Sequence, residues 1–250
     1  MRDAPPRDHY SYTVYSDPST ARTFEDRRFG GPIGEIVADD QARAIIRGIG
    51  PLEGRRILDV GTGTGRAAVF LARGAAVVTG VDASEPMLDV ARERAAAQGV
   101  DVRFQLGDAH ALEFPDRAFD VVVSLRVLMH APDWPQVMGE LCRVADRLVV
   151  FDYPARTSFA LPQAAVRRLM YALGRNTEPY RVFGTSEVRG ELAKAGYRVC
   201  LVHRQFVLPI ALHKAIGSRR FTLLVEGLLA RIGLLSVFGS PVTLVAERYA

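Results

Sequence analysis

Short apolar runs alternate with longer amphipathic stretches between residue 55 and about residue 153. This alternation predicts βαβ units and a parallel sheet. The predicted strands are Arg56–Val60, Ala76–Val81, Val102–Leu106, Phe119–Leu125 and Arg147–Phe151, and the predicted helices cover about 65–73, 84–98 and 133–145. The helix at 84–98 is the clearest, because apolar residues recur at helical spacing between Ser84, a good N-cap, and Gly99, a stop signal.

The pattern continues on both sides of this region. Two more strands are predicted near Tyr197–Phe206 and Pro241–Glu247, and the last could enter the sheet antiparallel. Residues 1–50 combine a polar, tyrosine-containing stretch with a helix through Ile36–Ile46, which we interpret as a cover over the ligand-binding end of the sheet. We therefore expect a single domain over residues 1–250, with a cover at 1–50, a cofactor-binding core at 55–153 and a substrate-side half at 154–250.

The segment at 213–240, between the last two predicted strands, is strongly apolar. Glu226, Arg231 and three glycines interrupt it, so it falls short of the run of about 20 apolar residues that spans a membrane. One interpretation is a helical insertion packed onto the domain's own core, which we favour. The other is an apolar lid or a peripheral membrane contact that serves a hydrophobic substrate. The two interpretations are compatible.

The composition is typical of a globular protein and constrains the function only a little further. The chain is 48% hydrophobic and 24% charged, with a net charge of +4. The basic residues are scattered among acidic ones, which is typical of a solvated surface and excludes nucleic acid as an expected partner. Cys142 and Cys200 lie in apolar runs without C-x-x-C spacing, so we expect both to be buried and reduced. The first ten residues contain no apolar signal segment, so a cytoplasmic protein is expected.

A glycine-rich turn, Asp59–Gly65, follows the first strand and precedes the first helix. Such a turn lets the backbone approach a ligand closely, because no Cβ blocks the way. Its spacing is ambiguous: Gly61, Gly63 and Gly65 form G-x-G-x-G, while Gly63, Gly65 and Ala68 also satisfy the G-x-G-x-x-A pattern of dinucleotide sites. A tight turn without any ligand is the structural alternative.

Three carboxylates at strand ends bear on the choice of ligand. Asp82 follows the second strand about 20 residues after the turn, where it can accept hydrogen bonds from both ribose hydroxyls of either cofactor. Asp59 lies within an apolar strand, where it would repel a pyrophosphate but suits the methionine portion of S-adenosylmethionine. Asp108, after the third strand, could meet the exocyclic amine of adenine. Loop amides could instead satisfy Asp59 and Asp108, and Asp82 could cap a helix, although Ser84 is better placed for that.

Residues 56–153 resemble the class I S-adenosylmethionine-dependent methyltransferases, in the group that includes the ubiquinone and menaquinone biosynthesis methyltransferases. The resemblance rests on LDVGTGTG at 58–65, VDASEPMLDVAR at 81–92, GDAHALEFPDRAFDVVVS at 107–124 and LRVLMHAPDW at 125–134. It implies a Rossmann-like, doubly wound sheet of seven strands, mostly parallel with the last strand antiparallel. It also implies these cofactor contacts: Asp59, Gly61, Thr62 and Gly63 at the methionine portion, within the turn that Gly65 completes; Asp82 at the ribose; Ala83 and Met87 at the faces of adenine; Asp108 and Ala109 at its edge; and Ser124 and Leu125 beside the methionine end.

Methyl transfer from a sulfonium is an in-line displacement, so the protein mainly supplies alignment and a water-poor pocket. A general base is needed only when the acceptor is a hydroxyl, an activated carbon or a protonated amine. His130 is the first candidate, because the resemblance puts its loop opposite the transferred methyl. A structural histidine that holds the loop is equally open. We expect His110 to be a surface or capping residue, and His203 and His213 to be exposed.

Other polar residues could also reach the site. Asp152 and Tyr153 follow the fifth predicted strand, where they could bind a substrate or, as we slightly favour, stabilise a loop. The residues near the amino terminus that could close over the cofactor are Tyr10, Tyr12, Tyr15, Phe24, Arg27 and Arg28. An arginine there could pair with the cofactor's carboxylate, or both arginines could lie on a solvated helix face. The isolated histidines and the lack of a metal-spaced carboxylate cluster indicate no metal site.

The sequence therefore predicts an enzyme that transfers a methyl group from S-adenosylmethionine to a small-molecule acceptor. The insertion at 213–240 and the apolar run at 201–212 suggest an apolar acceptor: a quinone, phenol, lipid or natural-product intermediate. Two alternatives stay open here, a nicotinamide- or flavin-dependent oxidoreductase and a non-catalytic cofactor-binding module. The sequence specifies neither the acceptor atom nor the oligomeric state.

Overall fold

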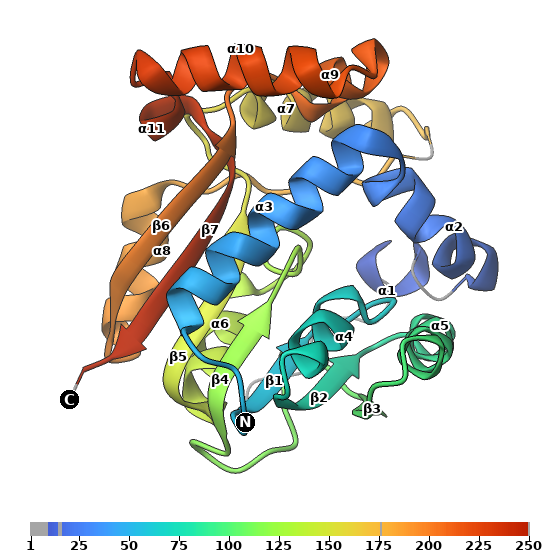
Figure 1. Ribbon diagram of the computed structural model, residues 1–250, viewed down its shortest axis with the longest axis vertical. Coiled ribbons are helices and arrows are strands. Elements are labelled where there is room, and N and C mark those ends of the chain that lie inside the picture. Colours follow the sequence, from blue (N-terminus) through green and yellow to red (C-terminus); the bar gives the residue numbers. More distant parts are fainter. Residues whose placement is uncertain (1–9, 15–16, 176, 250) are drawn as a thin grey trace.

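A computed structural model of the chain describes residues 10–14, 17–175 and 177–249. Within this part, the strands form one sheet in the order β3-β2-β1-β4-β5-β7-β6 (Figure 1). They are β1 (Arg56–Val60), β2 (Val77–Asp82), β3 (Val102–Leu106), β4 (Phe119–Ser124), β5 (Ala145–Tyr153), β6 (Tyr197–Phe206) and β7 (Ser240–Arg248). β7 is antiparallel to both of its neighbours, and the ladders among β1–β5 are parallel. The predicted mostly parallel, seven-stranded sheet with a reversed last strand is confirmed.

Helices cover both faces of this sheet. In the described part of the chain they are α1 (Tyr10–Val14), α2 (Pro18–Phe29), α3 (Gly31–Ile49), α4 (Arg66–Arg73), α5 (Glu85–Ala97), α6 (Trp134–Val144), α7 (Ala160–Ala172), α8 (Thr185–Lys194), α9 (Ile210–Ile216), α10 (Arg219–Arg231) and α11 (Leu234–Phe238). α3 and α4 pack on one face, and α6 and α8 pack on the other. α7 and α9–α11 lie beyond the carboxyl ends of the parallel strands, at the top of Figure 1.

The central strands form because their residues suit burial on both faces. Ile57, Leu58 and Val60 in β1 and Val121 to Val123 in β4 have no exposed surface. Continuous runs of β-branched and aliphatic residues are typical of parallel strands covered on both sides. Two separate apolar clusters result, one on each face of the sheet.

The predicted boundaries of α5 are supported by its capping contacts. The Ser84 hydroxyl accepts a hydrogen bond from the Met87 backbone N–H at 3.3 Å, as expected of an N-cap. Gly99, just beyond the helix, has a positive φ of +63°. Both residues therefore perform the roles that the sequence predicts for them.

β5 is longer than its predicted range, 147–151, and this changes the position of two candidate residues. Asp152 and Tyr153 are the last residues of the strand rather than part of a following loop. They pair with Thr243 and Val242 of the antiparallel strand β7. The extension arises from this pairing with a strand that comes about 90 residues later in the chain, which a local pattern does not reveal.

The burial predictions for Cys200 and His213 are wrong. Cys142 is buried as expected, but Cys200 is exposed, because β6 lies at the edge of the sheet. His213 was expected at the surface but is fully buried, because α10 folds over it and supplies hydrogen-bonding partners. His203 is half-buried, and its Nε2 lies 2.7 Å from a carboxylate oxygen of Asp40 on α3. No helix in the described residues is long and apolar enough to cross a membrane.

Candidate functional site

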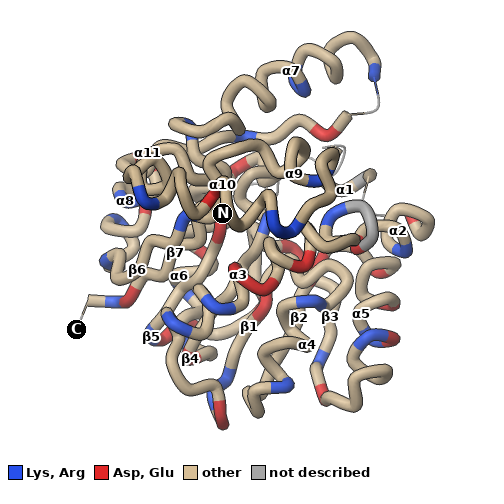
Figure 2. The backbone as a smooth tube through the Cα atoms, turned by 45° about the horizontal axis from the view of Figure 1, so that its top comes forward, with Lys and Arg blue, Asp and Glu red and all other residues tan. Residues whose placement is uncertain are grey.

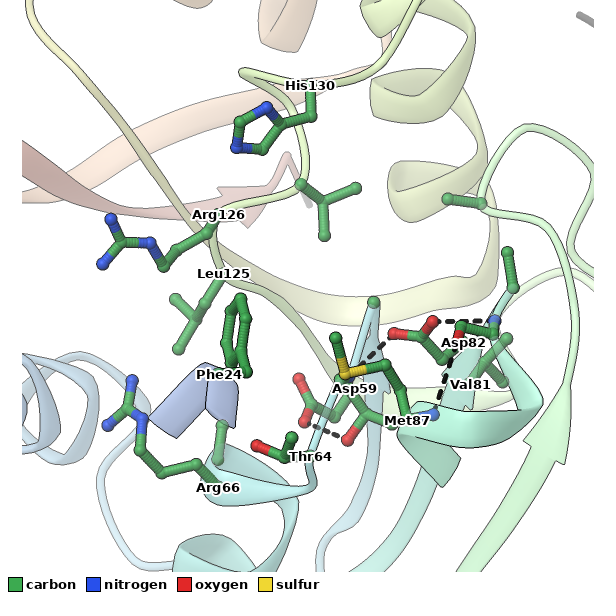
Figure 3. Close-up of a pocket in the computed structure, with 18 of the residues that line it drawn as sticks. Phe24, Asp59, Thr64, Arg66, Val81, Asp82, Met87, Leu125, Arg126 and His130 are labelled. Carbon is green, nitrogen blue, oxygen red and sulfur yellow. Dashed lines mark hydrogen bonds between the residues drawn. The ribbon is translucent and has the colours of Figure 1, made fainter. Parts of the chain in front are cut away.

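The main cavity opens at the carboxyl ends of β1, β2 and β4. The chain order reverses between β1 and β4, because β2 and β3 lie on one side of β1 and β5 lies beyond β4. The strand ends diverge at such a switch point, and ligands of open α/β sheets bind there. Figure 3 shows Asp59, Asp82 and Met87 on one side of this cavity and Arg126 and His130 on the other.

The glycine-rich turn is held close to β2 by its own backbone. The N–H groups of Gly61 and Thr62 both donate to the carbonyl of Val81, at 2.8 and 2.9 Å. Gly61 has φ +68°, and a Cβ there would lie 2.2 Å from a methyl of Val127. Gly63 has φ +54°, but a Cβ there would meet no protein atom within 4 Å. The first glycine is thus required by packing, whereas the second lines open space in the cavity.

Asp59 is a buried carboxylate at the floor of the cavity. It accepts a hydrogen bond from the Thr62 hydroxyl at 2.7 Å. Burial raises the pKa of Asp59 to about 6, although the Thr62 hydrogen bond and the charge of Arg66 oppose the rise. A cation that binds beside Asp59 would favour the ionised form of its carboxyl group.

Asp82 closes the other side of the turn. Its two carboxylate oxygens accept hydrogen bonds from the backbone N–H groups of Gly63 at 2.7 Å and Ser84 at 3.0 Å. Burial raises the pKa of Asp82, and these N–H groups partly offset the rise. Each carboxylate oxygen can accept a second hydrogen bond, so both contacts leave acceptor capacity that faces the cavity.

Asp108 has more partners than the sequence indicated. It accepts hydrogen bonds from the Tyr12 hydroxyl at 2.8 Å and from the backbone N–H of His110 at 2.8 Å, and its carboxylate lies 2.8 Å from His110 Nδ1. Burial raises the pKa of Asp108, but these hydrogen bonds outweigh it and hold the pKa at about 2. The expectation of a surface role for His110 is wrong: its side chain is buried, because it packs against this carboxylate.

The amino-terminal helices cover the cavity, and Tyr12, Phe24 and Arg28 line it. α2 is fixed to the turn through Glu25, which accepts a hydrogen bond from the Thr64 hydroxyl at 2.6 Å and lies 3.4 Å from Arg94. Tyr15 and the side chain of Arg27 lie outside the described residues. The position of Glu25 has no signal in the sequence, since its partners are about 40 and 70 residues away.

A second cavity adjoins the first, and the two share Arg28, Arg126 and His130 in their walls. It is assembled from distant segments: α3, α7, the end of β5, and the loop between β6 and α9. Apolar side chains such as Met129, Phe159 and Phe206 line it together with polar groups. The shared wall makes the two cavities neighbouring chambers of one site.

Arg126 marks the boundary between the chambers, and sequence reasoning missed it. Its φ is +62°, a left-handed conformation that is costly for arginine. Its backbone N–H donates to the buried carboxylate of Asp152, which also accepts from the Gln41 amide at 2.9 Å. Burial raises the pKa of Asp152, and the charge of Arg126 opposes the rise. Asp152 therefore holds the loop after β4, which is the role favoured from the sequence.

His130 faces both chambers and is almost fully buried. The Tyr10 hydroxyl donates to the Pro179 carbonyl and lies 2.7 Å from His130 Nδ1. A neutral imidazole has one donor and one acceptor nitrogen, so the tautomer decides which of the two Nδ1 is in this contact. Burial, with the nearby charges of Arg28 and Arg126, lowers the pKa of His130 to about 3. The side chain is thus neutral near pH 7.

The cavity gathers most of the candidate cofactor residues that the sequence suggested. Those that line it are Asp59, Gly61, Thr62, Gly63, Asp82, Ala83, Met87, Asp108, Ala109 and Leu125. The catalytic candidate His130 lines it too. Gly65 and Ser124 do not. Gly65 is the N-cap of α4, and a Cβ there would lie 2.8 Å from that of Ala91. The Ser124 hydroxyl donates to the Val60 carbonyl at 3.1 Å and so joins β4 to β1. Their side-chain positions are explained by packing.

Arg66 is a further cavity residue without a sequence signal. Its guanidinium lies 4.0 Å from the centre of the Phe29 ring and donates to the Gln41 side chain at 2.9 Å. Burial lowers the pKa of Arg66, although nearby carboxylates oppose this. It brings positive charge to the edge of the cavity opposite Asp82 (Figure 3). Over the described residues, no group of three or more His, Cys, Asp or Glu side chains is arranged to hold a metal ion.

Comparison with known proteins gives a consistent picture. Residues 57–147 match the family model described as a methyltransferase domain. Demethylmenaquinone methyltransferase of Thermus thermophilus is 46% identical over 105 residues, which cover 40% of this chain and 48% of that protein. Ubiquinone biosynthesis O-methyltransferase of Coxiella burnetii is 40% identical over 91 residues, covering 36% of this chain and 38% of that protein. The chain thus matches less than half the length of these relatives.

Two solved structures resemble this chain over nearly its whole length. Magnesium protoporphyrin IX methyltransferase of Synechocystis PCC 6803, with bound SAH, has a TM-score of 0.68 at 20% identity, covering 97% of this chain and 100% of that one. A structure of the same protein with bound SAM has a TM-score of 0.64 at 20% identity, covering 99% and 100%. At this level of identity the likeness shows a shared fold, including the segments outside residues 57–147.

Proposed function

We propose that this chain, which carries a class I S-adenosylmethionine-dependent methyltransferase domain homologous to the ubiquinone and menaquinone biosynthesis methyltransferases, transfers a methyl group to a small-molecule acceptor. The family match sets aside the oxidoreductase interpretation of the glycine-rich turn. The observation that carries the proposal is the pair of adjoining chambers, one lined by the family's motif residues and the other by both apolar and polar side chains.

The first chamber suits a cationic methyl donor. S-adenosylmethionine carries a positive sulfonium and a positive amino group, and it supplies an activated methyl. Asp59 is a buried carboxylate with a raised pKa, so it gains from a nearby cation. Gly63 leaves open space for close approach. In this proposal Asp59, Gly61, Thr62 and Gly63 hold the methionine portion.

The remaining contacts of the donor follow the same edge of the sheet. Asp82 accepts from the ribose with its unused acceptor capacity, Ala83 and Met87 contact the faces of adenine, and Asp108 and Ala109 meet its edge. Leu125 lies near the methionine end. Arg66 and Arg28 supply positive charge at the cavity wall for the donor's carboxylate.

The acceptor occupies the second chamber, so that its reacting atom lies at the shared wall. Met129, Phe159 and Phe206 favour an apolar body there and exclude water from the reacting groups. In-line displacement needs alignment above all, and the protein supplies it by holding both molecules in adjoining chambers. His130 lies at the junction as a neutral imidazole, the position from which it would take a proton from an acidic acceptor.

Two measurements test this proposal. Calorimetric titration with S-adenosylhomocysteine should show binding, and titration with NADH should not; binding of NADH alone would contradict the methyl-donor assignment. Labelled S-adenosylmethionine should then transfer label to a member of a panel of phenols, quinones, amines and lipids. A folded protein that binds S-adenosylhomocysteine but labels none of these would favour a non-catalytic module.

A further inference from the structure

α10 is packed with two polar side chains inward and most of its leucines outward. Thr222 and Glu226 are its buried residues, whereas Leu224 is 71% exposed and Leu228 is 56% exposed. Leu223 and Ile232 extend this exposed stripe at helical spacing. A helix that packs on a protein core normally does the reverse. The apolar surface of α10 therefore remains available to something outside the described part of the chain.

Hydrogen bonds fix α10 in this orientation. The carboxylate of Glu226 accepts from the backbone N–H groups of Val207 at 2.8 Å and Leu208 at 3.0 Å, and it lies 2.8 Å from His213 Nε2. The Thr222 hydroxyl lies 3.1 Å from the other nitrogen of His213. Rotating the helix to bury its leucines would leave these buried groups unpaired, which is costly. The outward leucines are therefore built into the fold.

Other helices at the same end of the molecule also expose apolar side chains. We call α7, α9, α10 and α11 together the helical cap, which lies at one end of the molecule with α10 flat across it (Figure 1). The cap holds most of the large apolar side chains that the structure leaves exposed, from Leu161 to Tyr171 on α7 and from Leu212 to Phe238 on the other helices. Large contiguous apolar surfaces are typical of protein or membrane contacts.

Charge is segregated onto the same cap. Its four helices carry six basic residues and one acidic residue, Glu226, which is buried. The rest of the chain holds 26 basic and 27 acidic residues, so the cap accounts for the net positive charge. Figure 2 shows blue without red along α7. Arg219 lies 3.8 Å from Glu35, but among the described residues Arg220 and Arg231 form no ion pair.

We propose that the helical cap docks onto the surface of an anionic lipid bilayer. Helices that lie in the interface combine leucine or phenylalanine on one face with flanking arginine and lysine, and their apolar face enters the headgroup region by about 5–10 Å. Arginines at this depth are attracted to anionic headgroups. A second copy of the chain is the weaker occupant, because two identical basic surfaces repel each other. The docked helices lie on the membrane and do not cross it.

Docking has a consequence for the acceptor, and this consequence rests on the proposed function. The cap contributes Ala160, Ile210, Ala211 and Lys214 to the wall of the second chamber. A cap that rests on lipid would bring this chamber to the bilayer surface. An apolar acceptor could then reach the chamber without passing through water.

Cosedimentation with lipid vesicles tests docking independently of any methyl transfer. The purified chain should bind vesicles of phosphatidylcholine mixed with phosphatidylglycerol and should bind pure phosphatidylcholine vesicles at least about tenfold more weakly. Binding to the mixed vesicles should weaken in about 1 M salt, where screening is strong. Equal sedimentation with and without vesicles would overturn the proposal, whereas S-adenosylhomocysteine titration of the same sample tests the proposed function separately.

Matched variants locate the surface. Leu224→Ser should weaken vesicle binding about tenfold, because an exposed leucine no longer enters the lipid. Val77→Ser, at a residue 64% exposed at the other end of the sheet, should leave binding unchanged. Equal effects of the two substitutions would overturn the assignment to the cap. Both side chains are exposed, so neither change should unfold the protein.

The charge contribution is tested in the same way. Arg220→Gln combined with Arg231→Gln should weaken binding to the mixed vesicles about tenfold or more. Arg73→Gln combined with Arg103→Gln removes the same charge from exposed positions outside the cap and should have a much smaller effect. Sedimentation velocity tests the alternative of a second copy. If the protein does not bind vesicles but forms a dimer that Leu224→Ser dissociates, the surface is a dimer interface instead.

Discussion

The two chambers that meet at Arg126 and His130 are built in different ways. The first is formed largely by the ends of three adjacent strands and the turn after β1, where backbone N–H groups hold the carboxylates. The second is formed by side chains from α3, α7, β5 and the loop before α9, which are far apart in the chain. Backbone geometry thus dominates one chamber, and side-chain identity dominates the other.

This difference explains why the first chamber can be predicted from the sequence more readily than the second. A chamber made by backbone requires glycines and acids at fixed spacing, so it leaves a motif. A chamber made by side chains from distant segments can change its lining without changing the fold, so it leaves none. The helical cap extends the contrast, because it is anchored by buried polar residues and presents leucines outward.

The largest expected effect breaks the cap without touching the first chamber. Glu226→Ala leaves two backbone N–H groups and His213 without their acceptor, so we expect a loss of about 3 kcal/mol in the free energy of unfolding. Denaturant unfolding measures this loss. The exposed Glu53→Ala is the control and should change stability little. In the folded protein, a large loss of S-adenosylhomocysteine affinity would contradict the separation of the two regions.

A somewhat smaller effect is expected on the cofactor side. Asp82→Ala should weaken S-adenosylhomocysteine binding by about 1–3 kcal/mol, because it removes a charged acceptor from the chamber and frees the N–H of Gly63. Calorimetry measures the change, and circular dichroism checks the fold. Asp101→Ala, in an exposed loop, should bind as the unmodified protein does. Unchanged affinity in a folded Asp82→Ala variant would show that the ribose lies elsewhere.

A third effect depends on pH. The pKa of Asp59 is raised to about 6, so at about pH 5 roughly nine in ten molecules carry a protonated side chain. A cationic donor favours the ionised form, so binding must release this proton at low pH and becomes weaker there. Affinity for S-adenosylmethionine should therefore rise about tenfold from pH 5 to above pH 7. Asp59→Asn should flatten the profile, and a variant that keeps the full rise would assign it to another group.

The smallest expected effect concerns His130. Its pKa of about 3 means that the imidazole is already neutral at about pH 5, so its titration should produce no change in kcat/KM between pH 5 and pH 8. Measuring the profile for the unmodified protein and for His130→Asn tests this. A break near pH 6 to 7 that disappears in His130→Asn would show that the histidine titrates in the normal range. Full turnover by His130→Ala would remove it as a base.

Sequence reasoning succeeded where contacts are local. The positions of the strands and the capping of α5 by Ser84 follow from patterns within a few residues, whereas the reversal of the last strand follows from the resemblance to a known family. It failed for His110, His213 and Cys200, whose burial depends on partners or strand positions that a local pattern does not specify. It also missed Arg126, because its backbone conformation and its contact with Asp152 arise only in the folded chain.

The sequence by itself determined the strand-end wall of the first chamber, because βαβ order and the spacing of glycines and acids are set along one continuous stretch of chain. Tertiary structure added the amino-terminal helices that cover it. Tertiary structure alone decided the second chamber and the direction of the helical cap. Whether Leu224 or Glu226 faces inward depends on the backbone N–H groups of Val207 and Leu208, which α10 meets only after folding. Hydrophobicity alone would have turned the helix the other way, but the cost of unpaired buried polar groups decides its orientation.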